Sequence, residues 1–189
     1  MSTKPFSQQI ADLQSCLAQL DHDALQERLD RAAAAIGDAL VAGKPVLVCG
    51  NGGSAADSQH IAGELVGRFL KERKALNVRA LTVDTSVITA WANDVSYETV
   101  FARQVEAYGQ AGGVLWAIST SGNSANVLRA VEEARRHGMT VLALTGQSGG
   151  KLAGLADILI PVPSTLTPRI QEMHVMLYHY ICERVEAQF

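Results

Sequence analysis

The order of hydrophobic and polar positions divides the chain into two parts. Over residues 1–43 the apolar positions recur every three or four residues, which predicts two helices, the second ending near Gly43. The stripe of the first helix consists of Ile10, Leu13, Leu17, Leu20 and Ala24. Such a short stripe is typical of a packing face, and we expect this N-terminal helical arm to serve packing and oligomerisation.

From Lys44 onward, short apolar runs alternate with polar turns and helical stretches. The apolar runs span residues 46–49, 78–83, 114–119, 140–145 and 158–162. Strands that alternate with helices predict a doubly wound α/β fold with a five-stranded parallel sheet between helical layers. Since no linker or repeat interrupts the pattern, we expect one domain over 1–189, with residues 44–189 as its α/β core.

Polar turns follow three of the predicted strands, at residues 50–54, 119–124 and 145–150. The carboxyl ends of parallel strands share one edge of the sheet, where ligands of such folds bind. The first turn precedes a helix, so its backbone N–H groups and the helix dipole suit an anion. The second, STSGNS, offers small hydroxyl donors, although an ordinary strand-to-helix turn capped by Ser124 is the alternative. Together the turns favour a phosphorylated ligand.

A dinucleotide site is the competing interpretation of the first turn. Gly50, Gly52 and Ala55 fit the loose form G-x-G-x-x-G/A. That fingerprint also requires an acidic residue about twenty positions further on, at the end of the next strand. The nearest strand-end candidate, Asp84, lies well beyond that spacing. A nucleotide is therefore disfavoured against a small phosphate ester.

Four residues on two predicted helices form a candidate catalytic or metal-binding set. His60 and Glu64 stand at i and i+4, so they project from the same face of one helix. Gln171 and His179 lie on the last helix, about 12 Å apart along its axis. They can hardly converge within one chain, so we expect different subunits to supply parts of the site. The alternative is that these are ordinary packing or solvated side chains.

Composition narrows the range of functions. A chain of 189 residues with 48% hydrophobic content can bury one core. With a net charge of −3, no long apolar run and no basic-then-apolar N-terminus, we expect a cytoplasmic protein that binds neither nucleic acid nor membrane. We expect the basic clusters at 71–74 and 135–137 to be solvated helix ends. Cys16, Cys49 and Cys182 are scattered, which predicts core packing.

Five segments together resemble the phosphoheptose isomerase family of the sugar isomerase (SIS) superfamily. They are CGNGGSAADSQHIAGELVGRF, AWANDVSYETVFARQVEA, ISTSGNSANVLRA, ALTGQSGGKLA and TPRIQEMHVMLYHYICE. The resemblance extends from about residue 25 to residue 183. It implies a flavodoxin-like three-layer α/β/α sandwich and a homotetramer with active sites between subunits. It also implies conversion of sedoheptulose 7-phosphate to D-glycero-D-manno-heptose 7-phosphate, the first step toward ADP- or GDP-heptose precursors of lipopolysaccharide and other glycans.

The resemblance also assigns roles to individual residues. The implied sugar-phosphate contacts are Asn51, Gly52, Gly53, Ser54, Glu64, Asn93, Asp94, Ser119, Thr120, Ser121, Ser124 and Gln171. The implied ligands of one zinc ion per subunit are His60, Glu64, Gln171 and His179. Isomerisation through an enediol needs a base and an acid, which we assign to Glu64 and His179. Bound zinc would weaken both groups in those roles and could polarise the carbonyl instead, so both arrangements stay open.

Two other classes of SIS protein compete with the isomerase. A non-enzymatic adaptor resembling the replication-initiator-associating protein would share the polar turns and the tetramer but lack the acid/base pair. This chain has both Glu64 and His179, which favours the enzyme. A sugar-phosphate-sensing regulator would need a DNA-binding segment. Residues 1–43 show no basic recognition helix.

Overall fold

The fold is built on a five-stranded parallel sheet with strand order β2-β1-β3-β4-β5. The computed structural model describes residues 5–189. The strands are β1 (Val46–Gly50), β2 (Val78–Ala80), β3 (Val114–Ser119), β4 (Thr140–Thr145) and β5 (Ile158–Pro161). All five predicted strands are confirmed. The second is shorter than predicted, because the chain turns after Ala80 toward a helix that Asp84 caps by accepting a hydrogen bond from the N–H of Val87.

Seven helices surround this sheet in the described part of the chain. They are α1 (Phe6–Leu20), α2 (Asp23–Val41), α3 (Gly53–Val66), α4 (Thr85–Asp94), α5 (Val100–Tyr108), α6 (Ala125–Arg136) and α7 (Thr167–Glu186). Two short 3₁₀ segments, Tyr97–Thr99 and Gly150–Gly154, complete the chain. Among residues 5–189, no helix combines the length and the apolar character that crossing a membrane requires.

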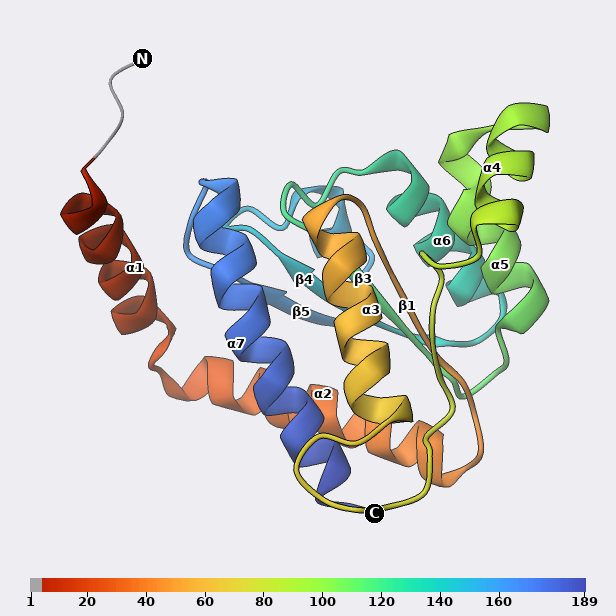
Figure 1. Cartoon of the computed structure of the whole chain (residues 1–189), viewed down its shortest axis with the longest axis horizontal. Coiled ribbons are helices and arrows are strands. Elements are labelled where there is room, and N and C mark those ends of the chain that lie inside the picture. The colour runs from red at the N-terminus through yellow and green to blue at the C-terminus, as the bar shows by residue number, and fades with distance from the viewer. Residues whose placement is uncertain (1–4) are drawn as a thin grey trace.

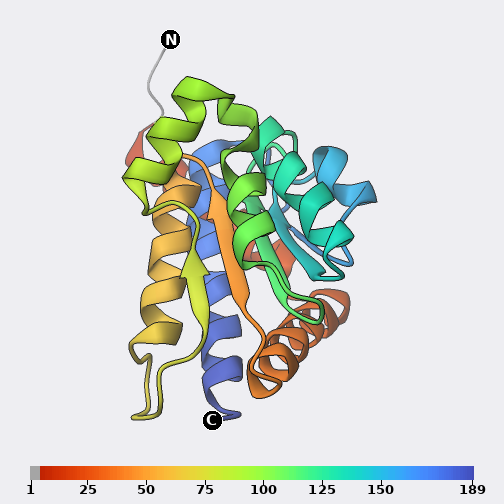
Figure 2. The ribbon, with the colours of Figure 1, turned by 90° about the vertical axis from the view of Figure 1, so that its right-hand side faces the viewer.

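The two faces of the sheet bury different layers of helices. In β3, Trp116 and Ile118 belong to the apolar cluster that includes α2, α3 and α7, whereas Leu115 and Ala117 belong to the cluster of α5 and α6. Figure 2 shows the sheet between these helical layers. Strands covered on both faces carry nearly continuous apolar residues. The predicted three-layer α/β/α sandwich is therefore confirmed.

The strand order places a topological switch between β1 and β3. These two strands pair in parallel along their length, while the chain continues from β1 to β2 on one side and from β3 to β4 on the other. Connections that leave a neighbouring pair in opposite directions open a crevice at the carboxyl ends of the pair. The first two predicted polar turns both begin there.

The two N-terminal helices differ in how they meet the core. Helix α2 buries Leu25, Leu29 and Ile36 in the same cluster as α7. Helix α1 projects away from the sandwich (Figure 1) and leaves Phe6 75% exposed and Ile10 43% exposed. Helix α2 is thus part of the core, and only α1 extends as an arm. The three cysteines are buried and unpaired, as the sequence predicts.

Helices α3 and α7 lie side by side and run in the same direction (Figure 1). At the start of α3, a Cβ atom on Gly53 would overlap the side-chain amide of Gln171. About two turns further along both helices, His60 meets Tyr178. The absence of a side chain at Gly53 therefore lets the two helices approach closely at the end where the polar turns lie.

At the other end of this pair, the basic cluster at 71–74 departs from expectation. The side chain of Arg73 is only 1% exposed and pairs with Glu186, with 3.1 Å between Nε and Oε1. Glu186 also accepts hydrogen bonds from the backbone N–H groups of Phe69, Leu70 and Lys71. Burial raises the pKa of Glu186, but these donors and Arg73 outweigh it and hold that pKa below its usual value. The prediction of a solvated helix end was wrong for Arg73.

The reason is that the chain after α3 folds back over the end of α7. Its backbone N–H groups need an acceptor there, and Glu186 supplies one from the last turn of α7. Arg73 also donates from Nη2 to the carbonyl oxygen of Glu64 at 2.7 Å. The other basic cluster behaves as predicted, because Arg135 and Arg136 lie exposed in the last turn of α6.

Replacing Arg73 by Met should lower the free energy of unfolding by about 3–5 kcal/mol, because it leaves the buried Glu186 carboxylate without its cation. Arg68→Met is the matched control, since the Arg68–Glu72 pair is exposed and should contribute less than about 1 kcal/mol. Urea unfolding of the two variants measures the difference. Equal stability of the two variants would mean that the three backbone donors alone hold Glu186.

Candidate functional site

A pair of asparagines connects the first polar turn to the element that follows the second. The side-chain amides of Asn51 and Asn126 exchange two hydrogen bonds of 2.8 Å. Tyr97 donates from its hydroxyl to Oδ1 of Asn51 at 3.0 Å. The amide of Asn51 is therefore fixed between α6 and the segment after α4. Asn126 and Tyr97 were not identified from the sequence, although both lie in segments that carry the family resemblance.

The first turn brings the N-terminus of α3 to the crevice. Gly52 has a positive φ of 56° and precedes Gly53, the first residue of the helix. A Cβ atom on Gly50 would lie 2.7 Å from atoms of Ser54, so only glycine allows this tight approach. Gln171 of α7 contacts Gly53 from the neighbouring helix. A helix N-terminus flanked by a polar side chain suits an anionic ligand.

The second turn gathers three hydroxyl groups at the end of β3. Oγ of Ser119 lies 3.0 Å from Oγ of Ser124 and 3.5 Å from Oγ of Ser121. Ser124 occupies the N-cap position of α6, but its side chain makes no capping hydrogen bond. Thr120, between them, is half-buried, and its carbonyl accepts a hydrogen bond from the N–H of Gly146. The hydroxyl of Ser124 thus joins a polar cluster, unlike the simple capped turn considered as the alternative.

Asn93 and Asp94 are the last two residues of α4. Both are exposed, and the Asn93 amide donates to Oδ1 of Asp94 at 2.8 Å. Helix α4 lies at the end of the molecule where α3 begins (Figures 1 and 2). The two side chains are therefore at the same end of the sheet as the polar turns, but they pair with each other.

A cluster of two histidines and a glutamate forms where α3 and α7 meet. Nε2 of His60 lies 2.9 Å from Oε1 of Glu64 and 3.4 Å from Nε2 of His179. One potential ligand atom from each residue lies within 4.8 Å of the others. Two imidazole nitrogens and a carboxylate oxygen form a donor set that fits a divalent metal ion such as zinc. This group could hold such an ion.

The fourth expected ligand lies apart from this cluster within the chain. Gln171 contacts Gly53, which precedes His60 by about two turns of α3, or roughly 10 Å along the helix axis. His179 is at the level of His60, and its ring stacks on Phe69 with 5.6 Å between centroids. The structure thus brings together three of the four expected residues and places Gln171 beside the first polar turn.

Burial and nearby charges shift two of the pKa values around this cluster. Partial burial lowers the pKa of His179, and His60 lowers it further, whereas Glu64 opposes the shift. Asp57, one turn before His60, is buried, and this burial raises its pKa to about 6 against the opposing effect of His60. Oδ2 of Asp57 has no hydrogen-bond partner in the described structure. Asp57 was missed from the sequence, where its position one turn before His60 was the available signal.

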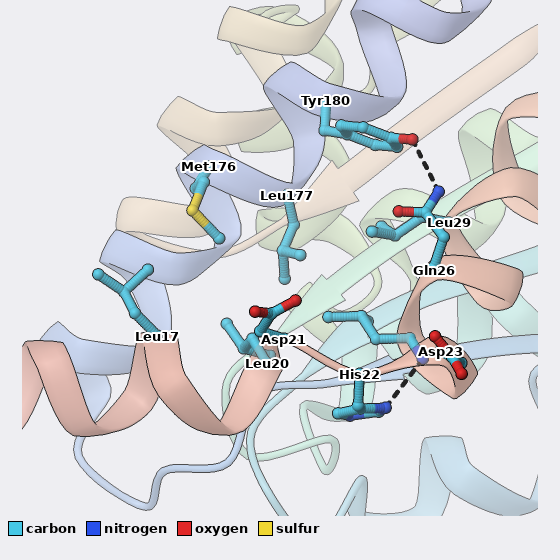
Figure 3. Close-up of a pocket in the computed structure, with 11 residues that line it drawn as sticks. Leu17, Leu20, Asp21, His22, Asp23, Gln26, Leu29, Met176, Leu177 and Tyr180 are labelled. Atoms are coloured by element: carbon cyan, nitrogen blue, oxygen red, sulfur yellow. Dashed lines mark hydrogen bonds between the residues drawn. The ribbon is translucent and has the colours of Figure 1, made fainter.

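An apolar pocket lies elsewhere, between α1, α2 and α7 (Figure 3). Its volume is about 480 Å³, and its apolar wall includes Leu17, Leu20, Met176 and Leu177. Tyr180 lines it as well and accepts a hydrogen bond from the Gln26 amide at 2.7 Å. None of the expected site residues lines this pocket. The polar turns and the His60 cluster therefore form a separate site from this apolar groove.

Comparison with known proteins agrees with the fold and the polar turns. A family model described as the SIS domain matches residues 8–146. The phosphoheptose isomerase of a Nitratiruptor species is 56% identical over 152 residues, covering 80% of this chain and 81% of that protein. The fold and these turns define an α/β protein of the SIS class.

Comparison with solved structures narrows the assignment within the SIS class. Phosphoheptose isomerase GmhA from Neisseria gonorrhoeae is 43% identical, with a TM-score of 0.85 and coverage of 96% of this chain and 95% of that one. A phosphoheptose isomerase from Francisella tularensis is 38% identical, with a TM-score of 0.92 and coverage of 96% of both chains. The chain belongs to the SIS domain family and, within it, to the phosphoheptose isomerases.

Replacing Asp57 by Asn should stabilise the protein at high pH. Because folding raises the pKa of Asp57 from 3.8 to about 6, ionising this carboxyl above pH 6 destabilises the folded state by up to about 3 kcal/mol. The gain in Asp57→Asn should be full at pH 8, fall as the pH drops from about 6 through 3.8, and disappear near pH 3, where the wild-type carboxyl is protonated in both states. Urea unfolding across this range measures it.

The exposed Asp38→Asn variant on α2 serves as the control and should show no such pH-dependent gain. A constant difference between wild type and Asp57→Asn at every pH would contradict the burial of an ionisable carboxyl as the cause.

Proposed function

We propose that this protein is an aldose-ketose isomerase that converts sedoheptulose 7-phosphate to D-glycero-D-manno-heptose 7-phosphate, the first step toward ADP- or GDP-heptose precursors. One observation carries the proposal. In a chain of the phosphoheptose isomerase family, one partly exposed cluster contains Glu64, on the helix that begins at the polar turn, and His179, on the neighbouring α7. The reaction needs a base, an acid and a group that binds the phosphate, which a helix N-terminus can supply.

The two polar turns would hold the substrate. The phosphate would accept hydrogen bonds from the backbone at Gly52, Gly53 and Ser54 and from the hydroxyl cluster of the second turn, Ser119, Thr120, Ser121 and Ser124. Sugar hydroxyls would contact Asn51, Asn93, Asp94 and Gln171. Because backbone groups and short side chains supply the phosphate contacts, this part of the site is rigid and places the sugar chain relative to Glu64.

Proton transfer would follow from the positions of Glu64 and His179. The Glu64 carboxylate removes the proton from carbon 1 of the open-chain ketose, while His179 delivers a proton to the oxygen on carbon 2, which gives the enediol. The oxygen on carbon 1 then returns its proton to His179, and Glu64 delivers its proton to carbon 2, which gives the aldose. No proton is gained or lost overall, and each group ends in the state in which it began.

In the alternative arrangement the cluster would hold zinc, one ion per subunit, and Glu64 and His179 would no longer act as a free base and acid. Nε2 of His60, Nε2 of His179 and a carboxylate oxygen of Glu64 are donors that zinc accepts, and the amide oxygen of Gln171 is the fourth expected ligand. Zinc bound there supplies Lewis-acid polarisation of the substrate carbonyl. The ligands of the ion would then all lie on α3 and α7, whereas the substrate would also contact the second polar turn and the end of α4.

We also propose a homotetramer in which neighbouring subunits complete each site. Within the chain Gln171 is separated from the His60 cluster, so convergence of all four ligands calls for a second copy. Helix α1 offers exposed apolar residues for such contacts, and the apolar groove beside it is open (Figure 3). Burial of apolar surface between copies is the expected source of their affinity.

The activity is tested by incubating purified protein with sedoheptulose 7-phosphate and measuring aldoheptose 7-phosphate. Glu64→Gln and His179→Asn should each lower turnover by about 10²–10⁴-fold, because each removes a proton-transfer group. The exposed Glu72→Gln should retain full activity. Chelator treatment of the wild type, with zinc measured in every sample, separates loss of the ion from loss of the acid or base.

Two results would overturn this assignment. Full turnover by Glu64→Gln would remove Glu64 from the role of base. A wild-type protein that forms no product but binds a replication protein would identify the adaptor instead of the isomerase.

Light scattering should give a particle of four times the 20.2 kDa chain mass. Leu17→Glu, which places a carboxylate in the groove beside α1, should shift the protein toward smaller species and lower turnover with it. Val41→Glu, an exposed position at the end of α2, is the control and should stay assembled. A Leu17→Glu variant that remains a fully active tetramer would place the subunit interface on another surface.

A further inference from the structure

Tyr178 has a contact with His60 that no role described above uses. Its hydroxyl lies 2.9 Å from Nδ1 of His60. The residue is 1% exposed, and its ring packs edge-on against the rings of His60 and His179, with centroid separations of 5.4 and 4.9 Å. Tyr178 thus touches both imidazoles of the cluster from the buried side.

The two ring nitrogens of His60 face different partners. Nε2 faces the carboxylate of Glu64, which when ionised can only accept a hydrogen bond, so Nε2 carries the proton at their separation of 2.9 Å. In the neutral ring Nδ1 is then an acceptor, and the hydroxyl of Tyr178 donates to it. Glu64 therefore selects the tautomer of His60, and Tyr178 satisfies the other ring nitrogen in that orientation of the ring.

A hydroxyl can also serve the opposite tautomer. When the lone pair of Nε2 binds a metal ion, the proton resides on Nδ1, which then donates to the oxygen of Tyr178. A phenolic hydroxyl carries one proton and has lone pairs, so it can act either as donor or as acceptor. A phenylalanine at this position could neither donate a hydrogen bond to Nδ1 of His60 nor accept one from it.

We propose that Tyr178 is a positioning residue whose hydroxyl holds the ring orientation of His60, so that Nε2 points at Glu64 and His179. The part concerning zinc rests on the proposed function. A partner that orients a metal-binding histidine typically changes metal affinity by about 10–100-fold. The tautomer of His60 in the metal-free protein is independent of that proposal.

Tyr178→Phe and Tyr180→Phe form a matched pair for the test. Both remove one hydroxyl from α7, but that of Tyr180 contacts Gln26 at the apolar groove (Figure 3). In metal-free protein, nitrogen NMR of labelled imidazoles should show His60 protonated on Nε2 in wild type and in Tyr180→Phe. Tyr178→Phe should show a mixture of tautomers, because the ring can then turn and present either nitrogen to Glu64. Zinc affinity, measured by competition with a chromogenic chelator, should fall about 10–100-fold in Tyr178→Phe alone.

Each of the other possible results would overturn one named part of the proposal. A wild-type His60 that carries its proton on Nδ1 in the metal-free protein overturns the positioning role without any variant. So does a Tyr178→Phe spectrum that matches wild type. If wild type binds no zinc, the proposed metal site fails, while the NMR comparison still decides the role of Tyr178. Equal zinc affinity in both variants overturns the effect of Tyr178 on the metal.

Discussion

The close parallel packing of α3 against α7 is the constraint on which the rest of the site depends. Gly53 allows the approach at one end, where Gln171 fills the space that a side chain would occupy. His60 meets Tyr178 midway, and Glu186 binds the chain that leaves α3 at the other end. Because the helices run in the same direction, residues about two turns apart on one meet residues about two turns apart on the other. Rotation or slippage of either helix would separate His60 from His179.

This packing places polar groups where the fold would otherwise bury apolar ones. Asp57 is buried with one carboxylate oxygen unpaired and a raised pKa, and it lies one turn from His60. Such a group destabilises the fold at neutral pH, and sites of this kind concentrate where function requires them. The sheet beneath these helices offsets this loss of stability, because every residue of β1 and β3 is buried. A fully buried apolar sheet thus lies beneath a helix pair that carries an unpaired buried carboxylate oxygen.

Sequence reasoning recovered the features whose signal is local. Apolar runs predicted the five strands, the glycine-rich turn predicted the start of α3, and spacing placed His60 and Glu64 on one face. What it missed were contacts between distant residues, such as Asn51 with Asn126 and His60 with Tyr178. Nothing in the local pattern separates these side chains from ordinary helix residues. Arg73 was misjudged for the same reason, because a short basic cluster indicates charge but does not reveal that a carboxylate 113 residues away is buried beside it.

The two ends of the α3–α7 pair differ in how strictly they require particular side chains. At the first polar turn, the proposed anion contacts come from backbone groups and small residues, so many sequences with the same fold could retain them. Further along the pair, the proposed chemistry depends on the side chains of Glu64 and His179, and a single substitution would remove it. On this proposal the fold and its polar turn would set the class of ligand, whereas the acid/base pair would set the reaction. A protein that kept Gly52 and Gly53 but lost Glu64 would then bind the same kind of molecule and leave it unchanged.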